Sequence, residues 1–207
     1  MTYHMKHNPP YIIGVTGGIG SGKSVVSHLL RLMDVPVYDC DREAKRLMCE
    51  SAVIRDALIA TVGAEVYDAS GKLNRVYLAS YMFGKAERVA QVNRIVHPVV
   101  RADFRTWAQQ SGKAVVAVES AILFEAEMDA DVDAVCVVHA SESVRLQRAI
   151  LRDGSNEKAV RNRMQSQLSE HEYMERADVV IHNDGAHSLI EQVVSLLERI
   201  AASVAKD

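Results

Sequence analysis

Short apolar segments alternate along the chain with longer segments in which apolar residues recur every three or four positions. The short segments, such as AVVAV and VDAVCVV, are continuously apolar, which is typical of strands buried on both faces of a parallel sheet. The longer segments have the spacing of amphipathic helices. We therefore predict an α/β fold with strands at Tyr11–Thr16, Val35–Asp39, Ala114–Glu119, Val132–Val138 and Asp178–His182.

The helical pattern fills the intervals between these strands. It predicts helices at Lys23–Leu32, Asp41–Val62, Arg75–Gln110, Ser141–Asp153, Asn156–Arg176 and His187–Ala205. The helical stretch between the second and third strands is longer than a plain crossover connection requires. We therefore predict an inserted helical subdomain there, which faces the substrate.

The phosphate-binding pattern G-x-x-x-x-G-K-[ST] occurs at Gly17–Ser24, directly after the first predicted strand. Its glycines, at positions 17, 18, 20 and 22, permit positive φ angles and let successive amides turn toward phosphate oxygens. Lys23 supplies charge to the β- and γ-phosphates, Ser24 offers a hydroxyl to Mg²⁺, and the following helix points its positive end at the same anion. The sequence thus predicts a nucleoside triphosphate site. The alternative is a glycine-rich turn without a ligand.

Acidic residues end two of the predicted strands, at the edge where open parallel sheets bind ligands. Asp39 and Asp41 follow the second strand, and a continued extended backbone would project both to the same side. One of them can accept a proton from an attacking hydroxyl or hold Mg²⁺ through water, while Asp41 can also serve as a helix N-cap. Glu119 ends the third strand, either as a metal carboxylate or as a solvated strand end.

Three arginines, Arg145, Arg148 and Arg152, lie along one stripe of a predicted helix. Guanidinium groups match the charge that develops on a transferring phosphoryl group, so the stripe can close over the triphosphate. The alternative is a solvated face that pairs with Glu142 and Asp153. Because a phosphate loop is present, we favour the first interpretation.

A turn signal follows this helix. DGSN, at positions 153–156, predicts a helix end, a turn and a new N-cap, which together form the hinge that a lid needs. We predict a lid at residues 141–176 that is mobile without ligand and excludes water when closed. The rest of the chain divides into a nucleotide-binding core, residues 11–40 with 112–140 and 177–207, and the helical substrate subdomain, residues 41–111.

Composition excludes several classes of protein. The 207 residues, 48% hydrophobic and 25% charged, suffice for one compact body with insertions. A net charge of −3 gives no general basic face, so we expect no nucleic-acid partner. No apolar run is long enough for a bilayer, and the polar leader at residues 1–10 lacks the apolar region of a signal peptide. We expect no membrane association.

The cysteines and histidines suggest no metal framework. Cys40, Cys49 and Cys136 are odd in number and widely spaced, which suits a reducing cytosol, and we predict a cytoplasmic protein. The eight histidines form no H-E-x-x-H pattern. His97 precedes a proline that disfavours helix at position 97, so we expect a structural or boundary role rather than catalysis. For the isolated aromatics Trp107 and Tyr173 we expect core packing.

Several segments, in order along nearly the whole chain, are specific enough together to indicate a family: GVTGGIGSGKS, VPVYDCDREAKRL, GKLNRVYL, NRIVHPVV, ESAILFEAEMD, VRLQRAILRDG and ADVVIHNDG. In these segments the chain resembles dephospho-coenzyme A kinases. The resemblance implies a P-loop kinase with a five-stranded parallel core, a helical substrate domain and a lid. It also implies transfer of the γ-phosphate of ATP, with Mg²⁺, to the ribose 3′-hydroxyl of dephospho-coenzyme A, the last step of coenzyme A synthesis.

The resemblance implies roles for individual residues. Asp41 would be the general base, supported by Asp39, while Lys23 and Arg148 stabilise the transferring group. The ATP-binding residues would be Gly17, Gly18, Ile19, Gly20, Ser21, Gly22, Lys23, Ser24, Asn183 and Gly185, with Ser24 also toward the metal. The acceptor would meet Thr16, Asp39, Arg75, His97, Leu123, Phe124 and Glu125. We expect small-molecule partners only, and a monomer or small homo-oligomer.

The chain departs from the family pattern at Ala121, where proline is usual, at Glu119, where aspartate is common, and in the lid turn DGSNEKA. These departures leave the metal role of Glu119 open and imply that lid closure differs in detail.

Two other interpretations use the same phosphate loop. One is another small-molecule kinase, of the adenylate or gluconate kinase type, against which the substrate-domain segments argue. The other is a GTPase-like switch: Asp68–Gly71 spells D-x-x-G, but no buried strand precedes it, and the N-K-x-D guanine motif is missing from the sequence. A kinase would prefer ATP in thermal-shift measurements, and a switch would prefer GTP.

Overall fold

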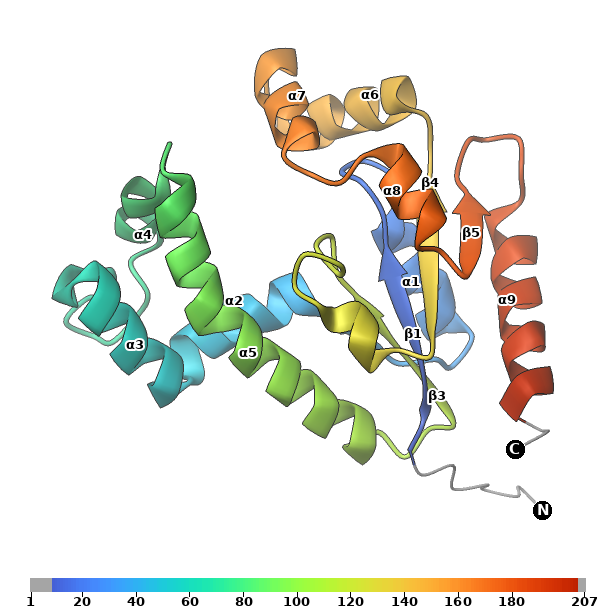
Figure 1. The fold of residues 1–207 in the computed structure, drawn as a ribbon, viewed down its shortest axis with the longest axis horizontal. Helices are drawn as coiled ribbons and strands as arrows, with labels where there is room; N and C mark the ends of the chain where they lie inside the picture. The colour runs from blue at the N-terminus through green and yellow to red at the C-terminus, as the bar shows by residue number, and fades with distance from the viewer. Residues whose placement is uncertain (1–8, 205–207) are drawn as a thin grey trace. The chain divides into compact units, whose positions relative to one another are not determined.

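A five-stranded sheet forms the centre of the larger part of the structure, a computed structural model that describes residues 9–204 (Figure 1). The strands are β1 (Tyr11–Thr16), β2 (Val37–Asp39), β3 (Val115–Glu119), β4 (Ala134–His139) and β5 (Val179–His182). Their order is β2-β3-β1-β4-β5, and β1 pairs in parallel with both β3 and β4. The predicted α/β fold with a parallel sheet is confirmed. Most of the leader predicted at residues 1–10, and Ala205 of the last predicted helix, lie outside the described residues.

The described chain divides into two compact units. The first contains the sheet and runs up to Tyr38 and again from Ala108 onward. Its helices are α1 (Lys23–Leu32), α6 (Glu142–Asp153), α7 (Glu157–Gln165), α8 (Glu170–Glu175), α9 (Leu189–Val204) and the 3-10 turn η2 (Met128–Asp131). The second unit, Asp39–Trp107, holds α2 (Cys40–Glu50), α3 (Ala52–Val62), η1 (Ala64–Val66), α4 (Arg75–Met82) and most of α5 (Ala86–Gln110).

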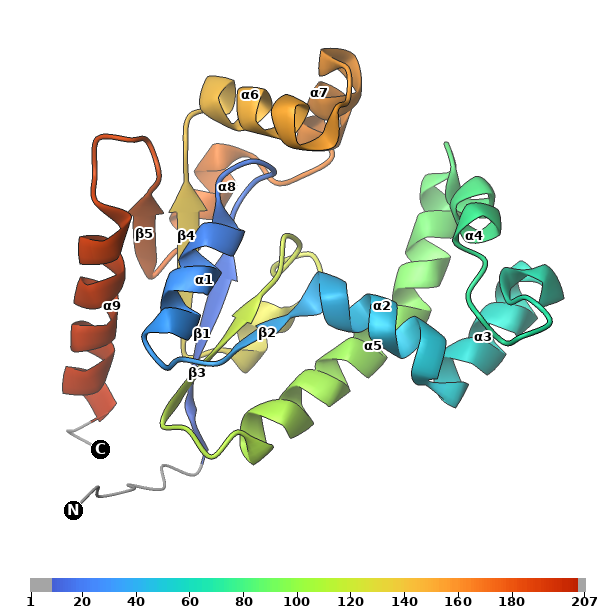
Figure 2. The ribbon, with the colours of Figure 1, turned by 180° about the vertical axis from the view of Figure 1, so that it is seen from behind.

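The core of the first unit lies between the sheet and two of its helices, α1 and α9 (Figure 2). Ile13 and Val15 of β1 are fully buried there, together with Val26 and Leu30 of α1 and residues of α9. On β1, Ile13 and Val15 pack in this core, while the Cβ position of Gly14 lies next to Leu123 and Val132. Burial of successive residues explains the continuous apolar pattern in the sequence.

Three of the long predicted helices are interrupted. The predicted helix at residues 41–62 breaks at Ser51, whose side chain accepts a hydrogen bond from the Ile54 amide and caps α3. The predicted helix at 75–110 breaks near Gly84, which has a φ of 66°. The predicted helix at 156–176 breaks after Gln165, the last residue of α7. Ser169 then caps the start of α8 and forms a capping box with Glu172.

The start of α2 corrects a prediction about the acidic pair. The helix begins at Cys40, and Asp39 is the N-cap, accepting a hydrogen bond from the Arg42 amide at 3.0 Å. The alternative that Asp41 caps this helix is therefore wrong. The backbone also does not stay extended through Asp41, which lies in the first helical turn.

Pro98 lies inside α5, within the helix predicted at residues 75–110, although proline disfavours helix at position 97. Proline removes one backbone hydrogen bond of a helix. Here Val96, Val100 and Phe104 form a buried stripe at helical spacing, and its packing outweighs that loss. Trp107 is half-buried beside Phe104, and Tyr173 is buried, as predicted for core aromatics.

The D-x-x-G segment forms a local turn. Its Asp68 carboxylate accepts hydrogen bonds from the amides of Ser70 and Lys72, and one isolated antiparallel bridge, Tyr67–Leu73, flanks it. These contacts fix the turn without a leading strand. Among the described residues, no helix has the length and apolar character needed to cross a membrane.

The burial difference between two leucines of α1 predicts their contributions to stability. Leu30 is fully buried, whereas Leu32 is 70% exposed on the same helix. Leu30→Ala should lower the free energy of unfolding by about 3 kcal/mol, because it leaves a cavity in the core. The matched Leu32→Ala should change it by less than about 0.5 kcal/mol. Urea denaturation of both variants measures the difference, and equal losses would contradict the assigned core.

Candidate active site

The phosphate loop connects β1 to α1 at the carboxyl edge of the sheet. Its flanking strands are β3 and β4, with Val15 in register with Glu119 and Thr16 in register with Val137. Glu119 therefore ends the strand beside the loop, where the sequence predicted a strand-end carboxylate. The parallel arrangement brings the ends of three neighbouring strands to one place.

The loop conformation depends on glycine, in two different ways. Gly22, the N-cap of α1, has a φ of 99°, and a Cβ there would collide with the carboxamide of Asn183. Gly18 does not have a positive φ, so that part of the prediction is wrong. Here the guanidinium of Arg145 occupies the space that a Cβ would need, so a larger residue would displace the end of this side chain.

Lys23 and Ser24 begin α1 directly after the loop. The Lys23 Nζ donates to the carbonyl oxygens of Gly17, at 2.6 Å, and Gly18, at 3.2 Å. These bonds hold the ammonium at the first half of the loop. Ser24 lies exposed in the first turn, so its hydroxyl oxygen is accessible to a cation beside a bound phosphate.

Asn183 connects three parts of this edge. Its Nδ2 donates to the Ser21 carbonyl at 2.8 Å, and its backbone amide donates to the His139 carbonyl at 2.7 Å. Its own carbonyl accepts from Nη1 of Arg148 at 3.1 Å. The residue predicted to hold adenine thus also fixes the phosphate loop, and Arg148 is directed toward it.

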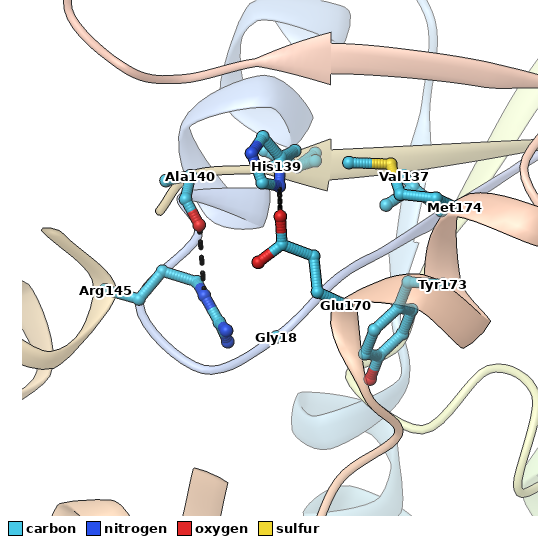
Figure 3. A pocket seen from close by; sticks show the side chains of 9 residues that line it. Gly18, Val137, His139, Ala140, Arg145, Glu170, Tyr173 and Met174 are labelled. Carbon is cyan, nitrogen blue, oxygen red and sulfur yellow. Dashed lines mark hydrogen bonds and ion pairs between the residues drawn. The ribbon is translucent and has the colours of Figure 1, made fainter. Parts of the chain in front are cut away.

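The arginine stripe of α6 separates into different environments. Arg145 donates through Nε to the Ala140 carbonyl at 3.1 Å, with its guanidinium at Gly18 (Figure 3). Arg152 instead pairs with Asp153 at 2.7 Å, as the alternative interpretation held. The hydrogen bonds that Asp153 accepts from Arg152 and Arg163 lower the pKa of its carboxyl to about 2. Two of the three arginines therefore lie toward the loop and its neighbour Asn183.

The connection between α6 and α7 has the predicted helix end, turn and N-cap. Gly154 caps α6 in the left-handed conformation, with a φ of 59°, and Asn156 caps α7 by accepting from the Ala159 amide at 2.8 Å. Ion pairs also join the two helices, including Arg161 to Glu142 at 3.1 Å.

A small cavity lies beside Gly18, between the end of β4 and α8 (Figure 3). The His139 Nδ1 faces the Glu170 carboxylate across it at 3.6 Å. Tyr173 lines the same cavity, and burial raises the pKa of its phenol to about 12. This phenol stays protonated at neutral pH, and its hydroxyl donates to the Ala121 carbonyl at 3.3 Å.

Burial separates the residues predicted to contact the acceptor in the first unit. Thr16 and Leu123 are fully buried, and Phe124 is 5% exposed beneath Tyr173 and Arg176. Their side chains pack in the core. Within this group Glu125 has an exposed side chain.

The second unit carries the other predicted residues: Asp39, Asp41, Arg75 and His97. Asp41 and Arg75 are exposed, at the starts of α2 and α4. His97 is half-buried in α5, and this burial lowers the pKa of its imidazole, which favours the neutral form. Such an environment supports the structural role that the sequence predicted for it.

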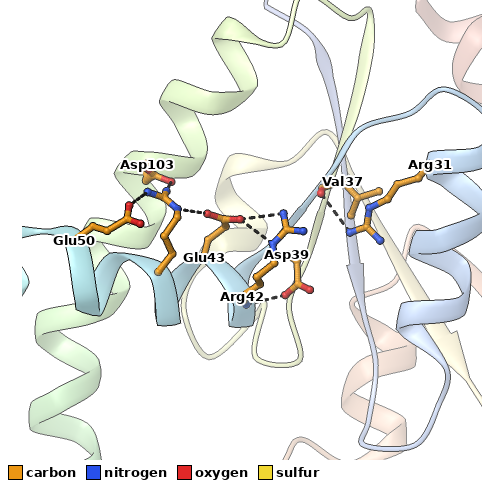
Figure 4. Close-up of polar contacts among 8 residues, drawn as sticks. Arg31, Val37, Asp39, Arg42, Glu43, Glu50 and Asp103 are labelled. Atoms are coloured by element: carbon orange, nitrogen blue, oxygen red, sulfur yellow. Dashed lines mark hydrogen bonds and ion pairs between the residues drawn. The ribbon is translucent and has the colours of Figure 1, made fainter. Parts of the chain in front are cut away.

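An ion-pair network in this unit was not predicted (Figure 4). Arg46 of α2 bonds to Glu43, to Glu50 at 2.8 Å and to Asp103 of α5 at 2.9 Å. The hydrogen bond from Arg46 lowers the pKa of the Glu43 carboxyl. The network joins α2 to α5, while Asp41 stays exposed outside it.

The sequence also gave no indication of Gln167, which contacts the phosphate loop. Its Oε1 accepts a hydrogen bond from the Ile19 amide at 2.7 Å. The two residues are 148 positions apart, and Gln167 fell inside a predicted continuous helix. The contact is made by the backbone amide of Ile19, so the identity of this residue does not indicate that a glutamine side chain binds there.

Comparison with known proteins agrees with the resemblance found in the sequence. The sequence profile described as dephospho-CoA kinase matches residues 11–188. A dephospho-CoA kinase of Bacteroides fragilis is 45% identical over 186 residues, which covers 89% of this chain and 90% of that protein.

Two solved structures are similar over nearly the whole chain. The crystal structure of TT1252 from Thermus thermophilus has a TM-score of 0.77 at 31% identity and covers 94% of this chain and 97% of that one. Dephospho-CoA kinase from Campylobacter jejuni has a TM-score of 0.68 at 22% identity and covers 93% and 98%. At this identity the second match supports the fold alone.

Gly22 provides a test of the loop geometry. Gly22→Ala should weaken ATP binding by at least about tenfold, because a side chain at positive φ is strained and collides with Asn183. Gly112→Ala is the matched control: its φ is also positive, at 64°, but nothing lies within 4 Å of its Cβ position. This control should lose some stability and retain ATP affinity. Isothermal titration of ATP measures both, and unchanged affinity in Gly22→Ala would contradict the described loop.

Proposed function

The chain belongs to the dephospho-CoA kinase family, and from this premise we propose that it transfers the γ-phosphate of ATP to the ribose 3′-hydroxyl of dephospho-coenzyme A. The observation that carries the proposal is the phosphate loop, in which the Lys23 ammonium bonds to the Gly17 carbonyl. The chain that contains this loop matches the family over residues 11–188. The products are ADP and coenzyme A. The three cysteines, which are free, support a cytoplasmic enzyme. For its assembly we keep the expectation of a monomer or a small homo-oligomer.

The first unit supplies the groups that bind and stabilise ATP. Loop amides and the start of α1 would hold the phosphates, and Lys23 would balance their charge. Asn183 supports the loop and, with Gly185, would contact adenine. Arg148, held at the Asn183 carbonyl, would stabilise the nucleotide from the α6 side.

The second unit supplies the general base. Asp41 would accept or orient the proton of the 3′-hydroxyl as its oxygen attacks the γ-phosphorus in line with the leaving ADP oxygen. Asp39 would support it indirectly, because its carboxylate caps α2 and fixes the backbone that carries Asp41. The other proposed contacts of the acceptor are Thr16, Arg75, His97, Leu123, Phe124 and Glu125.

Magnesium fits the oxygen donors at the start of α1. Ser24 presents an exposed hydroxyl there, and Mg²⁺ in such sites needs few protein ligands because phosphates and water complete its shell. When bound, the ion would neutralise phosphate charge. Glu119, at the end of the neighbouring strand, is the candidate for a contact through water. Residues 141–176 would close over the site and exclude water, which protects ATP from hydrolysis.

Acceptor preference tests the proposed activity directly. With ATP and Mg²⁺, the protein should phosphorylate dephospho-coenzyme A, and should act far more slowly on AMP or gluconate. Product formation for the three acceptors is measured side by side. A preference for AMP or gluconate would overturn the assigned substrate and leave a P-loop kinase of another specificity.

Replacement of Asp41 tests the assignment of the base. Asp41→Ala should lower kcat by about 100-fold or more, since general-base catalysis contributes on this scale, with the ATP dissociation constant unchanged. The matched control is Asp56→Ala, an exposed aspartate of α3 in the same unit, which should retain full activity. Steady-state kinetics and ATP titration give the two readouts. Parallel loss of ATP binding and rate would make Asp41 structural.

A further inference from the structure

The phosphate loop is held by a residue that the proposed mechanism has not yet used. Gln167 lies in the short connection between α7 and α8, and its Oε1 accepts from the Ile19 amide at 2.7 Å. This distance is within the usual range for a hydrogen bond between an N–H group and an oxygen, and both groups are neutral. It commits the Ile19 amide to the protein, while Ser21 likewise donates its amide to the Gly18 carbonyl at 3.1 Å.

Packing fixes both partners of this hydrogen bond. The side chain of Ile19 packs against an apolar cluster of α6 and α7, formed by Leu146, Ala149 and Val160. The backbone N–H of Gln167 donates a hydrogen bond to the Met164 carbonyl at the end of α7. On its other side, α8 is anchored through the buried Tyr173. Both partners of this hydrogen bond are therefore packed against neighbouring elements at the loop.

Gln167 contacts the loop next to Gly17 and Gly18, where two positively charged side chains lie. The Lys23 ammonium bonds to the carbonyls of Gly17 and Gly18, and the Arg145 guanidinium lies at Gly18. The lysine of a phosphate loop reaches the β- and γ-phosphates. Ile19 and its partner Gln167 are thus next to the place where the terminal phosphate binds.

The chemistry of a carboxamide suits this place. Its oxygen accepts and its amino group has two donors on the same planar unit. Because Oε1 is held by Ile19, the amino group is held at the loop as well. Donors fixed before the reaction stabilise the charge of a transferring phosphoryl group without reorganisation.

We propose that Gln167 is a further catalytic residue, whose Oε1 stays on the Ile19 amide while Nε2 donates a hydrogen bond to the terminal phosphate of ATP. It forms no covalent bond and moves no proton. The inference rests on the proposed ATP site and is independent of which acceptor is phosphorylated. It predicts that Gln167 distinguishes ATP from ADP.

The test is isothermal titration of ATP and of ADP, each with Mg²⁺ and without acceptor, into the full chain and its variants. Gln167→Glu keeps an acceptor for Ile19 but replaces the donor by a negative charge. It should weaken ATP binding by at least about tenfold and ADP binding by less than about threefold, because only ATP has a phosphate at that place. Gln167→Leu should weaken ATP binding by a smaller factor, again with little effect on ADP.

Gln165→Leu is the matched control, because Gln165 is exposed at the end of α7 and should bind both nucleotides as the unaltered chain does. Equal weakening of ATP and ADP in the Gln167 variants would overturn the proposal and leave Gln167 as a support of the loop. Unchanged ATP binding in Gln167→Glu would overturn it too, and this variant decides if Gln167→Leu does not fold. Failure of the unaltered chain to phosphorylate dephospho-coenzyme A would refute the proposed function without touching this result.

Discussion

The phosphate loop must satisfy two opposing requirements, and the contacts around it follow from that constraint. Its amides must be open toward an anion, which requires glycine, and glycine gives the loop no stiffness of its own. The stiffness comes from side chains of distant segments. Asn183 holds Ser21, Gln167 holds Ile19, and Arg145 fills the space at Gly18. These contacts restrict the conformations of a glycine-rich sequence, and a restricted loop loses less entropy when a ligand binds.

A related division of labour separates the acids after β2. Since the helix begins at Cys40, Asp39 and Asp41 are in different backbone environments although they are two positions apart. Asp39 uses its carboxylate to cap the helix, and Arg46 ties Glu43, Glu50 and Asp103 into one network that joins α2 to α5. Asp41 remains exposed at the start of α2, a helix that is capped by Asp39 and joined to α5 through Arg46. An acid in that position can serve substrate chemistry without weakening the fold.

The sequence predicted β1 and α1 with the bounds that the structure has. The apolar run marks the strand, and the GKS motif marks the start of the helix. It failed at Ser51 and Ser169, where a capping side chain outweighs an apolar period that continues past it. At Pro98 the helical pattern was the better guide, since the buried stripe of α5 overrides the local preference of proline. The loop itself is local and was predicted. Its supports were not, because contacts over 148 and 162 positions depend on how the strands and helices pack.

The arginines of α6 show why position on a helix does not by itself define a role. Their common stripe suggested one function, yet each guanidinium bonds to a different acceptor. For Arg145 this is the Ala140 carbonyl at the end of β4, and for Arg148 the Asn183 carbonyl after β5. Arg152, one turn further along α6, bonds to the side chain of Asp153. Charge is available to a triphosphate where α6 meets the carboxyl ends of the strands, and it is neutralised by an aspartate where the helix leaves them. In the proposed mechanism, the part of the stripe next to the sheet edge is therefore the part that would take part in phosphoryl transfer.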